Sequence, residues 1–187
     1  MSLRVLRDRL VVGSLKYGMN EPTVEAQGYD RATLEPLAQA PVDLFIGIDE
    51  CGPVLCGFNH KEISILDRDS YAVLWRVSGE SVIWTTSGLL VGDGRLRLVD
   101  ALTGRTLVDA AGWVPVYHLR RFPADKGPAV MIRQVNERTY IGHLTPQGIR
   151  VLGSVPRPLR ECQSYEDLMV CAAPKGGAEV WRLDLRG

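Results

Sequence analysis

Hydrophobic and polar positions alternate along much of the chain, in short stretches that turn residues interrupt. The clearest stretch spans residues 88–107, where an apolar run from Leu89 to Val91 ends at Gly92-Asp93-Gly94. Glycine accepts the positive φ that a tight hairpin needs, and alternation resumes after it. Asp100 and Thr103-Gly104 then predict a second turn, because an Asp carboxylate accepts backbone N–H bonds two residues on. The stretch is predicted to be three strands joined by two turns.

The Asp-containing turn recurs, which indicates an internal repeat. Its copies begin at Asp30, Asp67, Asp100 and Asp184, with a degenerate copy at 143–148, and follow one another at intervals of 33 to 45 residues. Such intervals suit one four-stranded blade each. Every copy follows an alternating strand, which in turn follows a short apolar run. The runs are Arg9–Gly13, Val54–Gly57, Leu89–Gly92, Ala129–Ile132 and Leu168–Cys171.

We therefore predict an all-β fold of the β-propeller type, a single repeat domain of about four to five four-stranded antiparallel blades. The units are approximately 1–40, 41–78, 79–110, 111–154 and 155–187, and the last stops before its fourth strand. Terminal blades expose apolar surface and unpaired strand edges. The chain is then a compact four- or five-bladed ring, the later part of a longer propeller, or an arc that a second copy completes. The last two are favoured.

The four cysteines follow the repeat. Cys51 and Cys162 each end the first strand of a blade, and Cys56 and Cys171 stand on the strand that follows. Cysteines that face each other across a hairpin lie within bridging distance, so we predict the disulfides Cys51–Cys56 and Cys162–Cys171. The alternative is four reduced thiols, while zinc is disfavoured by these spacings. Disulfides would indicate an extracytoplasmic protein, either secreted or exposed from a membrane anchor.

At its corners the chain resembles the quinoprotein-like (PQQ-type) β-propeller repeat, whose signature is Ala-x-Asp-x-x-Thr-Gly-x-x-x-Trp. The matching residues are Asp67, Trp75, Asp100, Thr103 and Gly104. Ser70 and Val108 stand where the signature has Thr and Trp. In that family the Trp docks between neighbouring blades, so the resemblance implies a structural, blade-docking role for Trp75 and both corners. The family's Ca²⁺ ligands, Asp base and stacking Trp have no match here, so no cofactor is expected.

Composition limits the partners. The chain has 22 Lys plus Arg and 22 Asp plus Glu among 187 residues, so no net charge draws it to nucleic acid or to an anionic membrane. It has no run of 18 or more apolar residues, and no membrane span is expected. Residues 1–4 lead directly into the folded pattern without an apolar leader, which indicates either a cytosolic protein or a chain from which a leader was removed.

Polar residues give little sign of a catalytic or metal site. His60, His118 and His143 fall in a hairpin turn, the first strand of the fourth unit and a third strand, so surface or turn roles are expected. The acidic clusters Asp49-Glu50 and 161–167 lack the Asp-x-Asp-x-Asp-Gly order of a Ca²⁺ loop, which favours solvated turns. The sequence has no nucleophile elbow, phosphate-binding glycine loop or His-Glu-x-x-His motif. We expect no enzyme, and no catalytic, metal or cofactor residues.

Residues 113–128 form the longest segment outside the repeat. Tyr117, Arg120, Arg121 and Phe122 offer a partner-binding patch there, because Arg and aromatic residues dominate interface hot spots. The alternative is a blade-connecting loop whose aromatics pack inward.

For function we expect the exported part of a bacterial protein, a non-catalytic scaffold that binds or senses a protein, peptide or small ligand. A second copy of the chain is a candidate partner. The alternatives are part of a quinone-dependent oxidoreductase and the extracellular sensor domain of a signalling kinase.

Overall fold

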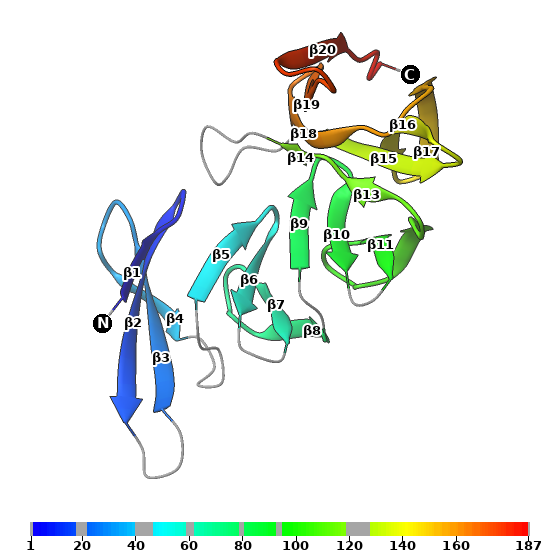
Figure 1. Ribbon diagram of the computed structural model, residues 1–187. Helices are drawn as coiled ribbons and strands as arrows, with labels where there is room; N and C mark the ends of the chain where they lie inside the picture. The colour runs from blue at the N-terminus through cyan, green and yellow to red at the C-terminus, as the bar shows by residue number, and fades with distance from the viewer. Residues whose placement is uncertain are drawn as a thin grey trace. The chain divides into compact units, whose positions relative to one another are not determined.

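In the computed structural model, residues 2–17, 22–39, 47–58, 62–78, 81–92, 95–118 and 128–186 are described. Within these ranges all regular structure is β-strand, arranged in five four-stranded sheets (Figure 1). None of the described segments forms a helix that could cross a membrane. The predicted all-β fold of four-stranded, propeller-type blades is confirmed.

The first three sheets are antiparallel meanders, in which consecutive strands pair. The first contains β1 (Ser2–Val5), β2 (Arg9–Tyr17), β3 (Pro22–Asp30) and β4 (Pro36–Gln39). The second contains β5 (Gly47–Cys51), β6 (Val54–Phe58), β7 (Ile63–Asp67) and β8 (Val73–Val77). The third contains β9 (Ser81–Thr85), β10 (Gly88–Gly92), β11 (Leu96–Val99) and β12 (Thr106–Asp109). In each sheet the apolar run found in the sequence is the second strand, which has a strand on either side.

The segment that begins the fourth sheet also contributes a short strand to the fifth sheet. The fourth contains β13 (Val114–Pro115), β15 (Ala129–Val135), β16 (Arg138–Thr145) and β17 (Gly148–Val155). The fifth contains β14 (Tyr117–His118), β18 (Arg160–Tyr165), β19 (Leu168–Ala172) and β20 (Ala178–Arg182). β14 pairs with β18 in parallel. The prediction that His118 lies in the fourth unit is therefore wrong, and the fifth sheet is not purely antiparallel. The chain leaves the fourth sheet at Val116, whose N–H still bonds to Val130 O at 2.8 Å.

The chain forms two compact units. One comprises Met1–Val82 with Asp100–Arg105, and the other comprises Ile83–Val99 with Thr106–Gly187. We call them the first and second compact units.

Within each compact unit, sheets pack face to face through buried aliphatic side chains. In the first unit one core joins the first two sheets: Leu6, Val11, Ala26, Ile48, Leu55, Leu66 and Tyr71. In the second unit one core contains Leu90, Leu98, Ala110, Ala129, Met131 and Leu144. Another contains Val116, Val130, Ile141, Met169, Cys171 and Leu183, with Trp181 partly buried against it. Because successive strand residues point to opposite faces, each sheet can present an apolar face to its neighbour.

Candidate interaction surface and the contacts that position it

Three corners, which begin at Asp30, Asp67 and Asp100, fold in the same way. The Asp100 carboxylate accepts hydrogen bonds from Leu102 N at 3.1 Å, Thr103 N at 2.9 Å and Thr103 Oγ1 at 2.8 Å. The corresponding groups bond to the carboxylates of the other two corners, with Ser70 in place of Thr at Asp67. In each corner the backbone N–H of the Asp closes the turn on a carbonyl five residues later. The residues that recur in the sequence thus form the same hydrogen bonds in each of these three corners.

These bonds lower the pKa of each corner carboxyl. For Asp30 and Asp67 the largest cause is the hydrogen bond from the backbone N–H of Thr33 and of Ser70, respectively. For Asp100 the largest cause is the hydrogen bond from the Thr103 hydroxyl. All three corners belong to the first compact unit. Because hydrogen-bond donors favour the ionised form, the folded state holds these carboxylates ionised at a pH where the unfolded chain binds protons.

We expect the stability of the first compact unit to change little between about pH 7 and pH 5 and to fall below about pH 4. A lowered folded pKa stabilises the fold above the unfolded pKa, and this contribution is lost as the pH drops through the folded value. Urea midpoints measured from pH 7 to pH 3 check this, with D30N/D67N/D100N as the control that keeps an acceptor oxygen but cannot titrate. Equal loss of stability in both proteins would contradict the assignment.

The residue after the Ser or Thr is left-handed in all three corners. It is Leu34 (φ 60°), Tyr71 (φ 57°) and Gly104 (φ 69°). A Cβ on Gly104 would lie 2.8 Å from Cδ2 of Trp75, and Trp75 Nε1 donates to Ala101 O at 3.0 Å. The structure thus places Trp75 of β8 against the corner that Asp100, Thr103 and Gly104 form, where only a residue without a side chain leaves room for the indole.

Between the first and second sheets the arrangement is reversed: the aromatic residue belongs to the corner and the glycine to a strand. Tyr71 is fully buried, and a Cβ on Gly28 of β3 would lie 2.1 Å from its hydroxyl oxygen. Here the bulky side chain comes from the corner of the second sheet and meets a glycine in the first. Ala38 stands in the sequence where Trp75 stands one repeat later. The sequence alone did not show this exchange, because the repeat signature has glycine where Tyr71 occurs.

A charge cluster beside Tyr71 joins the first two sheets. Arg9 Nε and Nη2 donate to both oxygens of Asp8, at 3.1 and 2.9 Å, and Nη1 donates to Arg68 O. Arg68 Nη2 in turn bonds to Asp8 Oδ1 at 2.6 Å and Glu50 Oε1 at 2.7 Å. The Arg9 side chain is buried, and its guanidinium lies 5.7 Å from the Tyr71 ring centroid. The hydrogen bond from Arg9 is the largest cause that lowers the pKa of Asp8.

Glu50 was expected in a solvated turn, and that prediction is wrong. It lies on β5, its side chain is nearly buried, and its carboxylate also accepts Arg7 N at 2.9 Å. Sequence reasoning missed the cluster because Asp8 and Arg68 are 60 residues apart. The only local signal was the pair of adjacent opposite charges at Asp8-Arg9.

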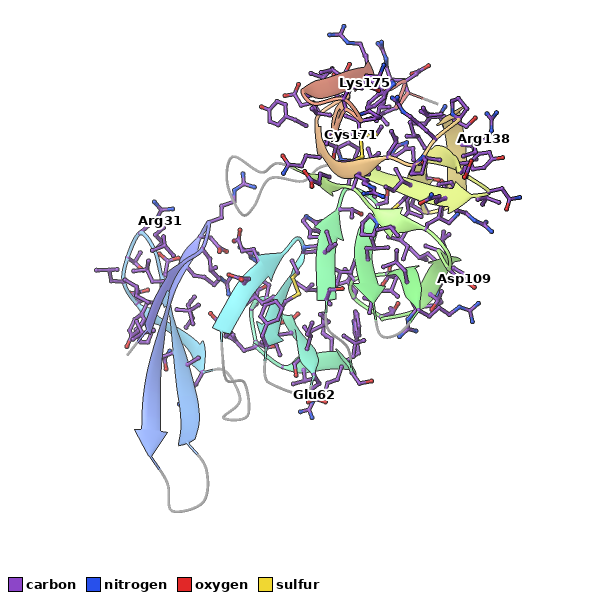
Figure 2. The ribbon with its side chains drawn as sticks, viewed as in Figure 1. Arg31, Glu62, Asp109, Arg138, Cys171 and Lys175 are labelled. Carbon is purple, nitrogen blue, oxygen red and sulfur yellow. A yellow bond between two sulfur atoms is a disulfide. The ribbon has the colours of Figure 1, made fainter. Side chains whose placement is uncertain are left out.

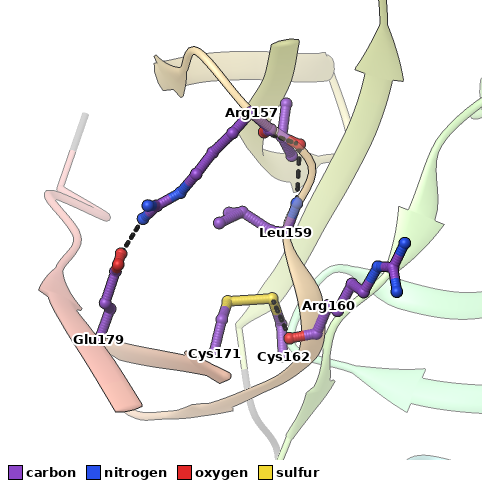
Figure 3. Close-up of a disulfide and its surroundings, with 7 residues drawn as sticks. Arg157, Leu159, Arg160, Cys162, Cys171 and Glu179 are labelled. Atoms are coloured by element: carbon purple, nitrogen blue, oxygen red, sulfur yellow. Dashed lines mark hydrogen bonds and ion pairs between the residues drawn. A yellow bond between two sulfur atoms is a disulfide. The ribbon is translucent and has the colours of Figure 1, made fainter. Parts of the chain in front are cut away.

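Both predicted cysteine pairs are bridged. Cys51–Cys56 joins β5 to β6, and Cys162–Cys171 joins β18 to β19. Figure 3 shows the second bridge with the Arg157–Glu179 ion pair, which links the segment before β18 to β20. Both features tie strands of the fifth sheet to one another or to the segment that leads into it. The fifth sheet is therefore fixed by covalent and ionic links in addition to its ladder.

An open hollow lies on the third sheet. Its volume is about 340 Å³ and it is lined by Arg95, Arg97, Thr106 and Asp109. Figure 2 labels Asp109, which lies on the outermost strand, β12, and forms an ion pair with Arg95. Arg97 Nη1 lies 3.4 Å from the Thr106 hydroxyl. The Arg95 guanidinium in this hollow is thus already paired with a carboxylate.

The fifth sheet has an exposed apolar face, which we call the fifth outer face. It consists of Gln163, Tyr165, Leu168, Val170, Val180 and Arg182, which the register places on one side of the sheet. Val170 and Val180 are directly opposite each other and are 36% and 61% exposed. Met169 and Cys171, which alternate with Val170, point to the opposite side and are buried. This sheet therefore has apolar residues on both faces, and among the described residues only the face with Met169 and Cys171 belongs to a packed core.

The first sheet has a similar exposed side, which we call the first outer face. It consists of Leu3, Val5, Leu10, Val12, Gln27 and Tyr29. Leu3 and Val5 are 61% and 60% exposed, and the other four are half-buried. Val11 and Ala26, on the opposite side, belong to the core of the first unit. Sequence reasoning expected exposed apolar surface at terminal blades but did not name these residues.

Three solved structures similar to this chain have TM-scores below 0.5. The crystal structure of the mitotic checkpoint complex contains a chain 16% identical, with a TM-score of 0.48, covering 97% of this chain and 60% of that one. The computationally designed Ika4 protein is 12% identical, with a TM-score of 0.40 and coverages of 73% and 89%. BamB from Moraxella catarrhalis is 12% identical, with a TM-score of 0.42 and coverages of 97% and 69%.

The chain thus spans 60% of the length of the checkpoint-complex chain. No protein-family model matches it, and neither does any curated protein sequence. The fold assignment therefore comes from the strand pairing of this chain itself.

Several predicted residues lie outside the described part. Arg120, Arg121 and Phe122 of the predicted patch fall there, as does His60, and only the backbone of Tyr117 is described. His143 is a partly buried strand residue opposite Arg150, so the expected surface or turn role is wrong for it. Burial and, secondarily, Arg150 lower its pKa. Among the described residues, no three His, Cys, Asp or Glu side chains form a metal-binding group.

Proposed function

We propose that this chain is a non-catalytic, propeller-type scaffold that binds a protein partner through the fifth outer face. The observation that carries the proposal is the pair Val170 and Val180, exposed beside each other on a sheet whose opposite face is a packed core. Contiguous exposed apolar surface on a soluble protein marks interaction sites. A sheet fixed by a disulfide presents such a surface with little loss of conformational freedom on binding.

Several charged side chains of the first compact unit have structural partners, which supports a structural role for them. The carboxylates of Asp8 and Glu50 are bonded to arginines, and those of Asp67 and Asp100 are bonded within their own corners. Groups committed to such contacts hold the blades in place. We propose that the repeat is of the quinoprotein-like type and is used here without its cofactor. The Asp67-to-Trp75 spacing and the seat of Trp75 on Gly104 support this.

We propose an extracytoplasmic location, supported by the two disulfides. Alkylation of the protein in its native compartment, followed by mass spectrometry, is expected to leave all four cysteines unmodified until a reductant is added. Free alkylation of all four before reduction would contradict this location.

A photo-crosslinking amino acid tests the interaction surface directly. Placed at Val180 in producing cells, it is expected to form a covalent adduct with another polypeptide, identified by mass spectrometry. Leu102, which is similarly exposed (55%) but lies in a corner, is the matched control and is expected to give none. Equal adducts from both positions, or none from either, would contradict a specific surface.

A further inference from the structure

On the two outer faces, as on the sheet faces that pack inside the chain, apolar residues occupy alternate strand positions. In the first unit, Val11 and Ala26 of the first sheet pack with Ile48 and Leu55 of the second. In the second unit, Val130 of the fourth sheet packs in one core with Met169 and Cys171 of the fifth. In both cases alternate residues of one sheet meet alternate residues of the next. Sheet-on-sheet packing of this kind is the interface that this sequence forms repeatedly.

The first and fifth outer faces have similar compositions. Each carries two valines, at least one leucine, one tyrosine and one glutamine, spaced by strand alternation. The fifth outer face adds the exposed Arg182, and its partner there is Asp167 of the same chain at 3.5 Å. An aliphatic sheet face gains most from burial against another aliphatic sheet face, because apolar area then leaves water on both sides.

We propose that the fifth outer face binds the first outer face of a second copy of this chain. This inference rests on the proposed function and names its partner. A second copy of the chain would offer an apolar sheet face to each of the two exposed faces. The contact is heterologous, since different surfaces meet. Two copies that exchange both contacts form a closed dimer, and copies that share only one contact form a longer assembly.

Charge exchange across the contact tests the pairing. Purified chain with its disulfides intact is expected to show a weight-average mass above that of the monomer, rising with concentration, in sedimentation equilibrium. V180E and L3K each place an unpaired charge in the proposed contact, and each is expected to raise the dissociation constant roughly 100-fold. The double variant V180E/L3K puts opposite charges on the two faces that meet and is expected to regain most of the affinity. L102E is the matched surface control and is expected to leave association unchanged.

The results separate this pairing from its competitors. A monomer mass at every concentration up to about 100 µM overturns the proposal, because the contact would then have a dissociation constant well above that value. Association that V180E abolishes but L3K leaves intact overturns it in favour of contact between two fifth outer faces. If a charged variant fails to fold, V180S and L3S take its place and are expected to weaken association about tenfold by removing apolar area.

The failure of this inference differs from failure of the proposed function. A crosslink from Val180 to a different polypeptide, together with a monomeric purified chain, overturns the second-copy pairing and leaves the scaffold standing. Loss of both the crosslink and the association overturns both proposals.

Discussion

Replacing Arg9 with methionine is expected to destabilise the first compact unit by about 3 kcal/mol. Methionine keeps most of the stem beside Tyr71 but removes two hydrogen bonds to Asp8 and one to Arg68 O. The Arg9 side chain is 6% exposed, so water cannot replace these bonds. The half-exposed Asp8 keeps its bond to Arg68, which places the effect at the lower end of the range for a broken buried pair.

Hydrogen exchange and urea unfolding measure this effect. Peptides that cover residues 2–17 and 62–78 are expected to lose protection together, because Arg9 joins the first sheet to the corner of the second. R31M is the matched control: Arg31 is an exposed arginine in the corner between β3 and β4 (labelled in Figure 2), and its replacement is expected to cost less than about 0.5 kcal/mol. If R9M and R31M unfold at the same urea concentration, the cluster does not join the sheets.

Gly28→Ala is expected to cost about 2 to 3 kcal/mol, although alanine is only one methyl group larger. The added Cβ would stand 2.1 Å from the Tyr71 hydroxyl oxygen and 2.9 Å from Cζ. Tyr71 is fully buried and belongs to the core of the first unit, so it cannot move aside without displacing its neighbours.

Removing the hydroxyl should relieve much of this cost. The double variant G28A/Y71F is expected to be more stable than the sum of the single changes predicts, with a coupling of about 1 kcal/mol in urea titrations. G153A is the control, because nothing lies within 4 Å of a Cβ built on Gly153 and its expected cost is below about 0.5 kcal/mol. Strict additivity of G28A and Y71F would show that the clash is relieved elsewhere.

The charge cluster and the glycine contact share one feature: their members are far apart in the sequence. Arg7 is 43 residues from Glu50, and Arg9 is 59 residues from Arg68. The sequence pattern favoured a solvated turn at Glu50, because it cannot show that Arg68 and the backbone N–H of Arg7 will bond to the Glu50 carboxylate. Likewise, the sequence does not show that the strand glycine Gly28 contacts a bulky side chain of another sheet.

The pairing of the parallel strand β14 could not be predicted for the same reason, since its partner β18 is far away in the sequence. Its two residues follow Val116, which still bonds to the fourth sheet, and no local pattern marks the crossing to the fifth. Two residues are too few for alternation to identify a strand. The pairing is decided by which sheet offers a free edge, and that is a property of the assembled sheets.

The repeat, the corners at Asp30, Asp67 and Asp100, the strands with their apolar runs and both disulfides could be predicted from the sequence. All of these depend on residues close together in the chain, such as Asp100 and Thr103 or Cys51 and Cys56, so the backbone alone brings them into contact. The packing of the sheets was needed to show which side chains fill the space between blades, which charges are buried, and which sheet faces stay exposed. Those contacts join residues tens of positions apart, and their energy exists only once the sheets have packed.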